Sequence, residues 1–235
     1  MDTTAFSYLL ENVVLLFAVM ATFGFVLSKE FTWPNYIKKI LAGLTLGVIG
    51  ITIMSHPWKL SPGIVFDTRS VLISITGLFF GSIPTIVAVL MTAAYRIYLG
   101  GSGVVAGISV ILTSAAIGLG WRNLRKGKED QIKALELYRF GILVHVVMLL
   151  MMLWLPRDNR FDVIRQISLP VLLIYPGITV FIGILISNQY KSLTLSHKLT
   201  DSEQRLRLSN ELANVAVWEY NFKTCLLYTS PSPRD

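Results

Sequence analysis

The chain has 235 residues, of which 53% are hydrophobic and only 15% are charged, and its formal net charge is +7. The apolar residues fall in runs of about 18 or more, which is the length of a membrane span, so an ordinary soluble domain is excluded. In a membrane protein an excess of Lys and Arg marks cytoplasmic loops, and we therefore expect no nucleic-acid partner. The single cysteine, Cys225, excludes a disulfide framework and a multi-cysteine metal site.

Six apolar segments follow one another at residues 6–28, 36–54, 64–99, 103–121, 138–155 and 168–188. The first lacks a basic leader and more segments follow it, so it is interpreted as a span and not as a secretory signal. The third is too long for one crossing and contains Gly81 and Pro84, which interrupt helices and divide it into two spans. One long helix kinked at Pro84 is the alternative. The sequence thus predicts an all-α integral membrane protein, a bundle of about seven transmembrane helices with a cytoplasmic helical linker.

The loop between the fifth and sixth predicted spans carries the strongest concentration of positive charge. Six basic residues face three acids there: Arg122, Arg125, Lys126, Lys128, Lys133 and Arg139. The positive-inside rule places this loop in the cytoplasm. With seven crossings the N-terminus is then outside and the C-terminus cytoplasmic, in the inner (plasma) membrane of a bacterium.

Three ionisable residues are predicted to share the outer level of the membrane. Asp67 and Arg69 open the third span, and Arg96 lies near the end of the fourth, which runs antiparallel to it. An ionisable group within a span costs about 2.5–3.5 kcal/mol, so it normally faces a partner or a wet cavity. Asp67 can neutralise one arginine, which leaves a guanidinium able to hold a small anion or carboxylate. The alternative is that the three residues only lock two helix ends together.

Other polar and small residues within the spans favour packing roles. His145, in the sixth span, is interpreted as a hydrogen-bonded helix residue and not as a proton relay. Gly43 with Gly47, and Gly77 with Gly81, have the small-xxx-small spacing that lets two helices approach closely.

Several motifs occur in a fixed order and together resemble the LytS-type multi-span receptor domain. They are Phe66-Asp67-Thr68-Arg69, Gly77 and Gly81, Tyr95-Arg96, and Gly100-Gly101-Ser102-Gly103. The resemblance covers roughly residues 30 to 190, and it implies a bacterial inner-membrane sensor whose relatives include proteins of cell-wall and osmotic control. It also implies a set of signal-sensing residues at the matching positions, namely Asp67, Arg69, Arg96, Gly100, Gly101 and Gly103, with an unknown external ligand or membrane stimulus.

Residues 1–190 are accordingly assigned to the sensor domain, and residues 191–208 to a signalling helix. Leu195, Leu199 and Leu206 have spacings of four and seven, as in a coiled coil, which predicts a homodimer. Residues 209–224 resemble the start of a PAS domain, whose first strand often has the pattern of Trp218-Glu219-Tyr220-Asn221. Only this start is present, so no cofactor is predicted.

The final residues, 225–235, have no clear strand or helix pattern and are expected to be turn-like. They resemble the translation of a transposase-type sequencing adaptor codon by codon. We therefore predict that they are not part of the natural protein and that the PAS domain is cut short.

The sequence favours the sensor of a two-component histidine kinase, whose missing domains would act on a response regulator. The fragment itself contains no catalytic domain. A sensor that controls a diguanylate cyclase is the first alternative. A substrate-binding subunit of an energy-coupling-factor transporter is the second, and the PAS-like tail argues against it.

Overall fold

The computed structural model describes residues 18–19, 21–22, 24, 34–55, 58–61, 64–101, 103–125, 132–154, 160–212, 218–221 and 226–229. Almost all of the first predicted span, residues 6–28, lies outside these ranges, as do Lys126, Lys128 and Ser102.

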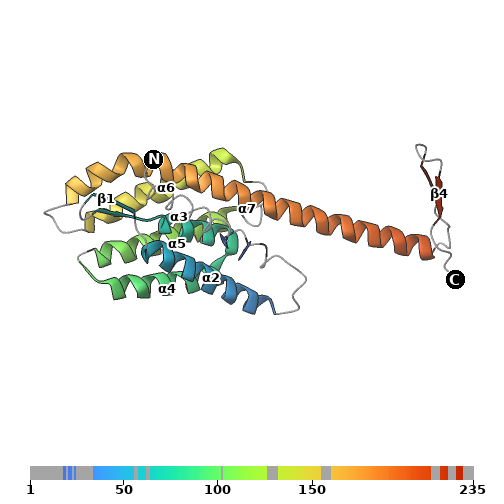
Figure 1. The fold of residues 1–235 in the computed structure, drawn as a ribbon, viewed down its shortest axis with the longest axis horizontal. Coiled ribbons are helices and arrows are strands. Elements are labelled where there is room, and N and C mark those ends of the chain that lie inside the picture. The colour runs from blue at the N-terminus through green and yellow to red at the C-terminus, as the bar shows by residue number, and fades with distance from the viewer. Residues whose placement is uncertain are drawn as a thin grey trace. The chain divides into compact units, whose positions relative to one another are not determined.

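The described part of the membrane region is a bundle of helices that lie alongside one another (Figure 1). Their bounds are α2 (Asn35–Ser55), α3 (Arg69–Ile75), the π-helix η1 (Thr76–Phe80), α4 (Ser82–Leu99), α5 (Val104–Arg125), α6 (Ala134–Met151), the 3-10 turn η3 (Met152–Trp154) and α7 (Arg160–Leu212). Two short strands, β1 (Trp58–Ser61) and β2 (Ile64–Phe66), pair antiparallel between α2 and α3. The predicted class, a multi-span all-helical membrane bundle, is confirmed.

Five helices in the described ranges are long and apolar enough to cross a bilayer, and they are α2, α4, α5, α6 with η3, and a segment of α7. The prediction of a full-length third span from residue 64 to Gly81 is wrong. Strand β2 occupies residues 64–66, and the helix that follows has seven residues in α3 and five in η1. At about 1.5 Å per residue this helix is shorter than the ~30 Å hydrocarbon layer.

The short helix is possible because protein surrounds it. Every residue from Ser70 to Phe80 is buried, and α3 and η1 between them contact α2, α4, α5 and α6. The helix ends at Gly81, where φ is +83° and the chain reverses into α4. The predicted break at this position is confirmed, and the alternative of one helix kinked at Pro84 is wrong.

Glycines let the helices of the bundle approach closely. A Cβ atom on Gly43 would lie 2.7 Å from Val87 Cβ of α4, and one on Gly77 would lie 2.9 Å from the backbone nitrogen of Leu119 in α5. Both distances are shorter than real Cβ contacts. The predicted packing role is therefore confirmed for Gly43 and Gly77, whereas Gly81 forms the turn between η1 and α4.

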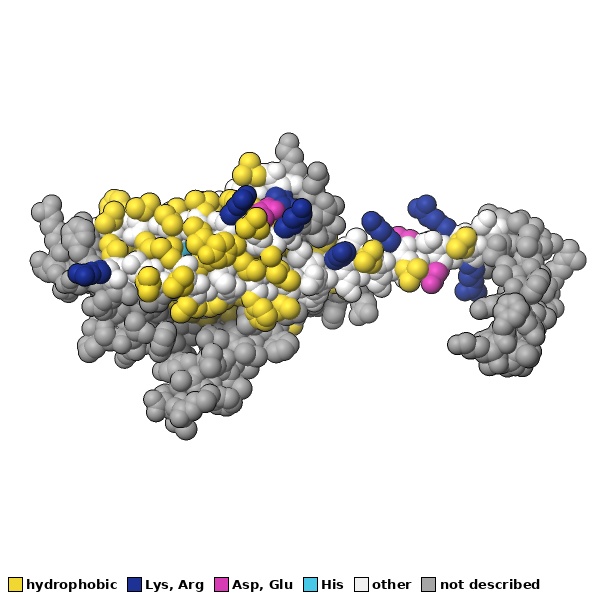
Figure 2. Space-filling model, turned by 90° about the horizontal axis from the view of Figure 1, so that it is seen from above, with side chains coloured by type: hydrophobic (Ala, Val, Ile, Leu, Met, Phe, Trp, Pro, Cys, Tyr) yellow, Lys and Arg dark blue, Asp and Glu magenta, His cyan; other side chains and the backbone are white. Residues whose placement is uncertain are grey.

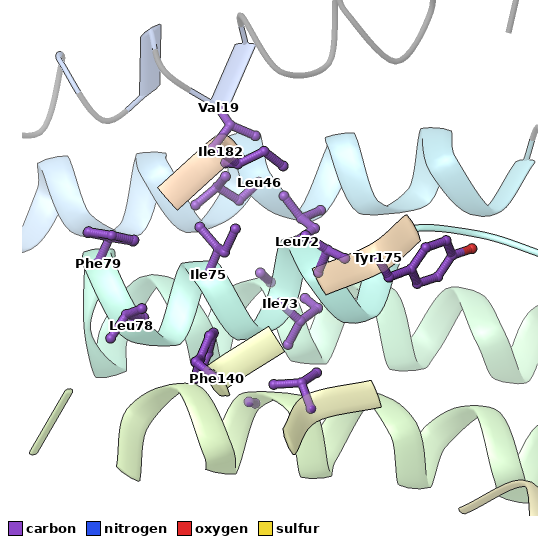
Figure 3. Close-up of a cluster of buried hydrophobic side chains, with 14 of the residues drawn as sticks. Val19, Leu46, Leu72, Ile73, Ile75, Leu78, Phe79, Phe140, Tyr175 and Ile182 are labelled. Atoms are coloured by element: carbon purple, nitrogen blue, oxygen red, sulfur yellow. The ribbon is translucent and has the colours of Figure 1, made fainter. Parts of the chain in front are cut away.

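Apolar side chains fill the bundle and also cover it. The largest buried ones include Leu46, Ile73, Leu78 and Phe140 (Figure 3). Others point outward from every long helix, for example Val48, Leu90, Leu112, Leu150 and Phe181, and Figure 2 shows hydrophobic side chains across the face of the bundle in view. An apolar exterior of this extent is suited to lipid.

The chain divides into two compact units, Met1–Tyr190 and Lys191–Asp235. The second contains the C-terminal part of α7, in which Leu195, Leu199 and Leu206 are exposed. It also contains β3 (Trp218–Asn221) and β4 (Leu226–Thr229).

Strands β3 and β4 pair antiparallel with Trp218 opposite Thr229. The expectation that residues 225–235 are turn-like is therefore wrong for Leu226–Thr229, where Tyr228 and Thr229 are strand-forming residues. The adaptor origin of this segment remains a prediction about the coding DNA.

Candidate functional site

A half-buried ion pair lies at the start of α3. The Asp67 carboxylate oxygen Oδ1 is 3.3 Å from Arg69 Nε and accepts a hydrogen bond of 3.2 Å from the backbone N–H of Arg69. The side chain of Asp67 is 11% exposed and that of Arg69 is 13% exposed. Asp67 thus serves as the counter-ion of Arg69 and as an acceptor for the first backbone amide of α3, that of Arg69.

Arg96 lies one turn before the end of α4 and completes the cluster. Its Nη1 donates a hydrogen bond of 3.2 Å to the carbonyl oxygen of Gly100. Its Nε is buried and has no hydrogen-bond partner within the described residues. Asp67 and Arg69 are the charged groups in its surroundings. The structure therefore brings the three predicted residues near one another, with the Asp67 carboxylate paired to Arg69.

A glycine that the sequence reasoning missed makes room for Arg96. A Cβ atom on Gly107 of α5 would lie 2.6 Å from Arg96 Nε and 3.0 Å from its Cδ. The arginine side chain therefore lies against the backbone of α5. No motif in the sequence of α5 marks Gly107 as a neighbour of Arg96, so this contact could not be predicted from the sequence.

Gly100, Gly101 and Gly103 form the turn between α4 and α5. Gly100 has a φ of +64° and Gly101 a φ of +87°, a region that side chains disfavour. No atom lies within 4 Å of a Cβ placed on either residue. The carbonyl of Gly103 accepts the first backbone bond of α5, from Gly107 N at 2.9 Å. These glycines shape the turn and place the Gly100 carbonyl beside Arg96.

A buried polar network extends from the cluster to α6 and α7. The Tyr175 hydroxyl donates a hydrogen bond of 3.2 Å to the backbone carbonyl of Asp67. The Tyr175 ring packs edge-on against that of His145, at a centroid distance of 5.1 Å. His145 Nδ1 is 2.7 Å from the Gly141 carbonyl, and its Nε2 is 3.3 Å from Ser70 Oγ. The hydrogen-bonded role predicted for His145 is confirmed, whereas Ser70 and Tyr175 were missed.

The opposite end of the bundle is held by a second set of polar contacts. Arg122 Nη1 donates to the carbonyls of Leu78 and Phe79, both at 2.9 Å. Glu136 pairs with Arg125 and accepts a hydrogen bond of 3.0 Å from Trp121 Nε1. These contacts join η1, α5 and α6 at the end where the predicted cytoplasmic loop lies.

Comparison with known protein families identifies a relationship that covers most of the chain. A family model described as the 5TMR of 5TMR-LYT matches residues 14–188, while no curated protein and no solved structure matches the chain. The matched segment includes the Asp67–Arg69–Arg96 cluster and the candidate spans in α2, α4, α5 and α6 with η3. It also includes α7 as far as residue 188. Because it covers more than half of the chain, the protein belongs to the 5TMR-LYT family and is a multi-pass LytS-type receptor domain of membrane sensor proteins.

Proposed function

We propose that this protein is the sensor of a bacterial two-component kinase and that it detects a small anion or carboxylate at Asp67, Arg69 and Arg96. The observation that carries the proposal is the state of Arg96, whose Nε is buried without a hydrogen-bond partner in the described structure. A buried charged donor without a partner is costly, and an anion that accepts from it recovers that cost.

The charges of the cluster favour an anion over a cation. Asp67 already pairs with Arg69 and accepts a hydrogen bond from its backbone amide. The hydrogen bond that Arg96 makes is to a neutral acceptor, the carbonyl of Gly100. Two guanidinium groups beside one carboxylate leave a local excess of positive charge. Guanidinium forks bind carboxylates and phosphates with charge-assisted hydrogen bonds.

Charge asymmetry supports an orientation in which this cluster faces the outside. The opposite end of the bundle carries Arg122, Arg125, Lys133 and Arg139, and the positive-inside rule assigns such an end to the cytoplasm. A ligand would then reach the cluster from outside the inner membrane, and the C-terminus would be cytoplasmic.

The C-terminal segment supports a signalling output. Helix α7 is continuous from Arg160 to Leu212 and includes the leucines of the predicted homodimer contact. Strand β3 contains the Trp-Glu-Tyr-Asn pattern that resembles a PAS start. A kinase and a diguanylate cyclase differ in the domain that follows, so the genomic sequence beyond the Thr224 codon distinguishes them.

Replacement of Arg96 tests the proposed anion site. We expect acetate, succinate or inorganic phosphate to raise the melting temperature of the wild-type protein in nanodiscs. Arg96→Gln removes a charged donor, so the concentration of the active anion needed for the same rise should increase at least about tenfold. Arg96→Lys keeps the charge but loses the fork, and it should give an intermediate value.

Arg165→Gln is the matched control because Arg165 is an exposed arginine in the first part of α7. Its melting curve and anion response should equal those of the wild type. A wild-type melting temperature that none of the three anions changes would contradict the proposal, as would an unchanged response in Arg96→Gln.

A further inference from the structure

We propose that Tyr175 is the positioning residue that transmits the state of the Asp67–Arg69 ion pair to α7. This inference rests on the proposed sensing function and adds a path from the site to the helix that leaves it. It follows from the contacts of Asp67, Tyr175, His145 and Ser70, which join α3, α6 and α7.

Asp67 is held at both of its ends. Its carboxylate binds Arg69, while its backbone carbonyl accepts the hydrogen bond of the Tyr175 hydroxyl. A ligand that draws Arg69 away from the carboxylate breaks the ion pair that fixes this residue. The carbonyl to which Tyr175 donates then changes position or direction. A change at the ion pair therefore reaches α7 through one residue.

The Tyr175 side chain has few ways to absorb such a change. It is only 8% exposed, and the ring of His145, which is 0% exposed, packs edge-on against it. Figure 3 shows Tyr175 at the edge of the apolar core with its hydroxyl turned away from the labelled aliphatic side chains. Because protein interiors are close-packed, the Tyr175 ring has little room to turn by itself. Movement of the Asp67 carbonyl therefore displaces α7 together with the ring.

His145 is in turn fixed by both ring nitrogens. The Gly141 carbonyl can only accept, so Nδ1 carries a proton, and in the neutral ring Nε2 accepts from Ser70 Oγ. Ser70 lies in α3, three residues after Asp67. The contacts form a closed circuit from α3 through α6 to α7 and back to α3. His145 and Ser70 therefore hold the Tyr175 ring in its orientation when the Asp67 carbonyl moves.

The proposal is tested with a reporter thiol on α7. Cys225→Ser removes the native cysteine, and Ser187→Cys places a thiol at a position of α7 that is 6% exposed. The rate of its reaction with N-ethylmaleimide in proteoliposomes reports how tightly α7 packs. Asp67→Asn weakens the ion pair and should change this rate about fivefold, the effect of roughly one net hydrogen bond. Adding Tyr175→Phe, which keeps the ring, should remove the dependence on Asp67→Asn.

Tyr138→Phe is the matched control, because Tyr138 is an exposed tyrosine of α6, and the Asp67→Asn effect should persist in it. An Asp67→Asn effect of equal size with Tyr175→Phe would show a merely structural tyrosine and overturn the proposal. No effect of Asp67→Asn in the parent protein would also overturn it. Anion-induced stabilisation, measured on the same Ser187→Cys protein, decides the proposed function separately.

Discussion

At the scale of single residues, the position of Arg96 depends on a neighbour without a side chain. Arg96 Nε, Cδ and Cγ all lie within van der Waals distance of the site where a Cβ on Gly107 would be. The backbone of α5 therefore forms one wall of the space that holds the guanidinium. A larger residue at this position would compete with Arg96 for the same volume.

We expect Gly107→Ala to impair anion binding more than stability. The added methyl would lie 2.6 Å from Arg96 Nε, and the flexible arginine can yield by moving its guanidinium away from Gly100. The free energy of unfolding should fall by about 1 kcal/mol, at the low end of overpacking effects. The anion concentration that gives the same rise in melting temperature should increase severalfold, as measured by melting curves in nanodiscs.

Gly120→Ala is the control for this substitution, because Gly120 lies in the same helix and no atom is within 4 Å of its Cβ position. It should leave anion binding unchanged and should not destabilise the protein. Equal anion responses in Gly107→Ala and the wild type would show that Gly107 does not set the position of Arg96.

The charged residues of the site could be predicted from the sequence, whereas its uncharged residues could not. Asp67, Arg69 and Arg96 are conspicuous in the sequence because ionisable groups are rare in apolar spans. Tyr175 and Ser70 are ordinary residues of membrane helices, and their roles depend on tertiary contacts with Asp67 and His145. No spacing along the chain encodes contacts between residues that are about a hundred positions apart.

At the scale of elements, the helix formed by α3 and η1 is unusual because it is short and buried from Ser70 to Phe80. Hydropathy predicts that residues 64–81 are apolar but does not distinguish a lipid-facing span from a helix that protein encloses. The π-helical turn ends beside Gly81, and its last carbonyls have no intrahelical partner. Arg122 of α5 supplies donors to two of them, on Leu78 and Phe79.

Arg122→Gln should therefore destabilise the bundle. The shorter side chain cannot reach both carbonyls, and buried acceptors without donors are costly. We expect the free energy of unfolding to fall by about 1.5–3 kcal/mol, the range for hydrogen bonds to charged groups. Reversible unfolding with sodium dodecyl sulfate measures this change.

Arg139→Gln provides the comparison, since Arg139 is an exposed arginine in α6, on the same predicted cytoplasmic loop. Its effect should stay within about 0.5 kcal/mol. If the two substitutions cost the same, the contacts of Arg122 with Leu78 and Phe79 contribute nothing specific to stability.

At the scale of the whole molecule, the sequence was sufficient for the class and most helix positions. Long apolar runs and the break near Gly81 predicted α2, α4, α5, α6 and the membrane part of α7, because lipid requires long helices with satisfied backbones. The length of the third helix could not be predicted, since it depends on how the other helices enclose it. The strand at Leu226–Thr229 was missed because a four-residue run carries little periodicity.

The distribution of charge across the bundle gives the last prediction, which concerns orientation. Lys133 is exposed just before α6, at the end rich in arginine and lysine, and Tyr98 is 84% exposed near the opposite end of α4. In a Cys225→Ser background, a membrane-impermeant maleimide added to intact cells should label Tyr98→Cys and not Lys133→Cys. Inverted vesicles should give the reverse, because positively charged loops stay in the cytoplasm. Labelling of Lys133→Cys in intact cells would show that the orientation is the opposite of the predicted one. The Asp67–Arg69–Arg96 cluster would then face the cytoplasm and sense an internal ligand.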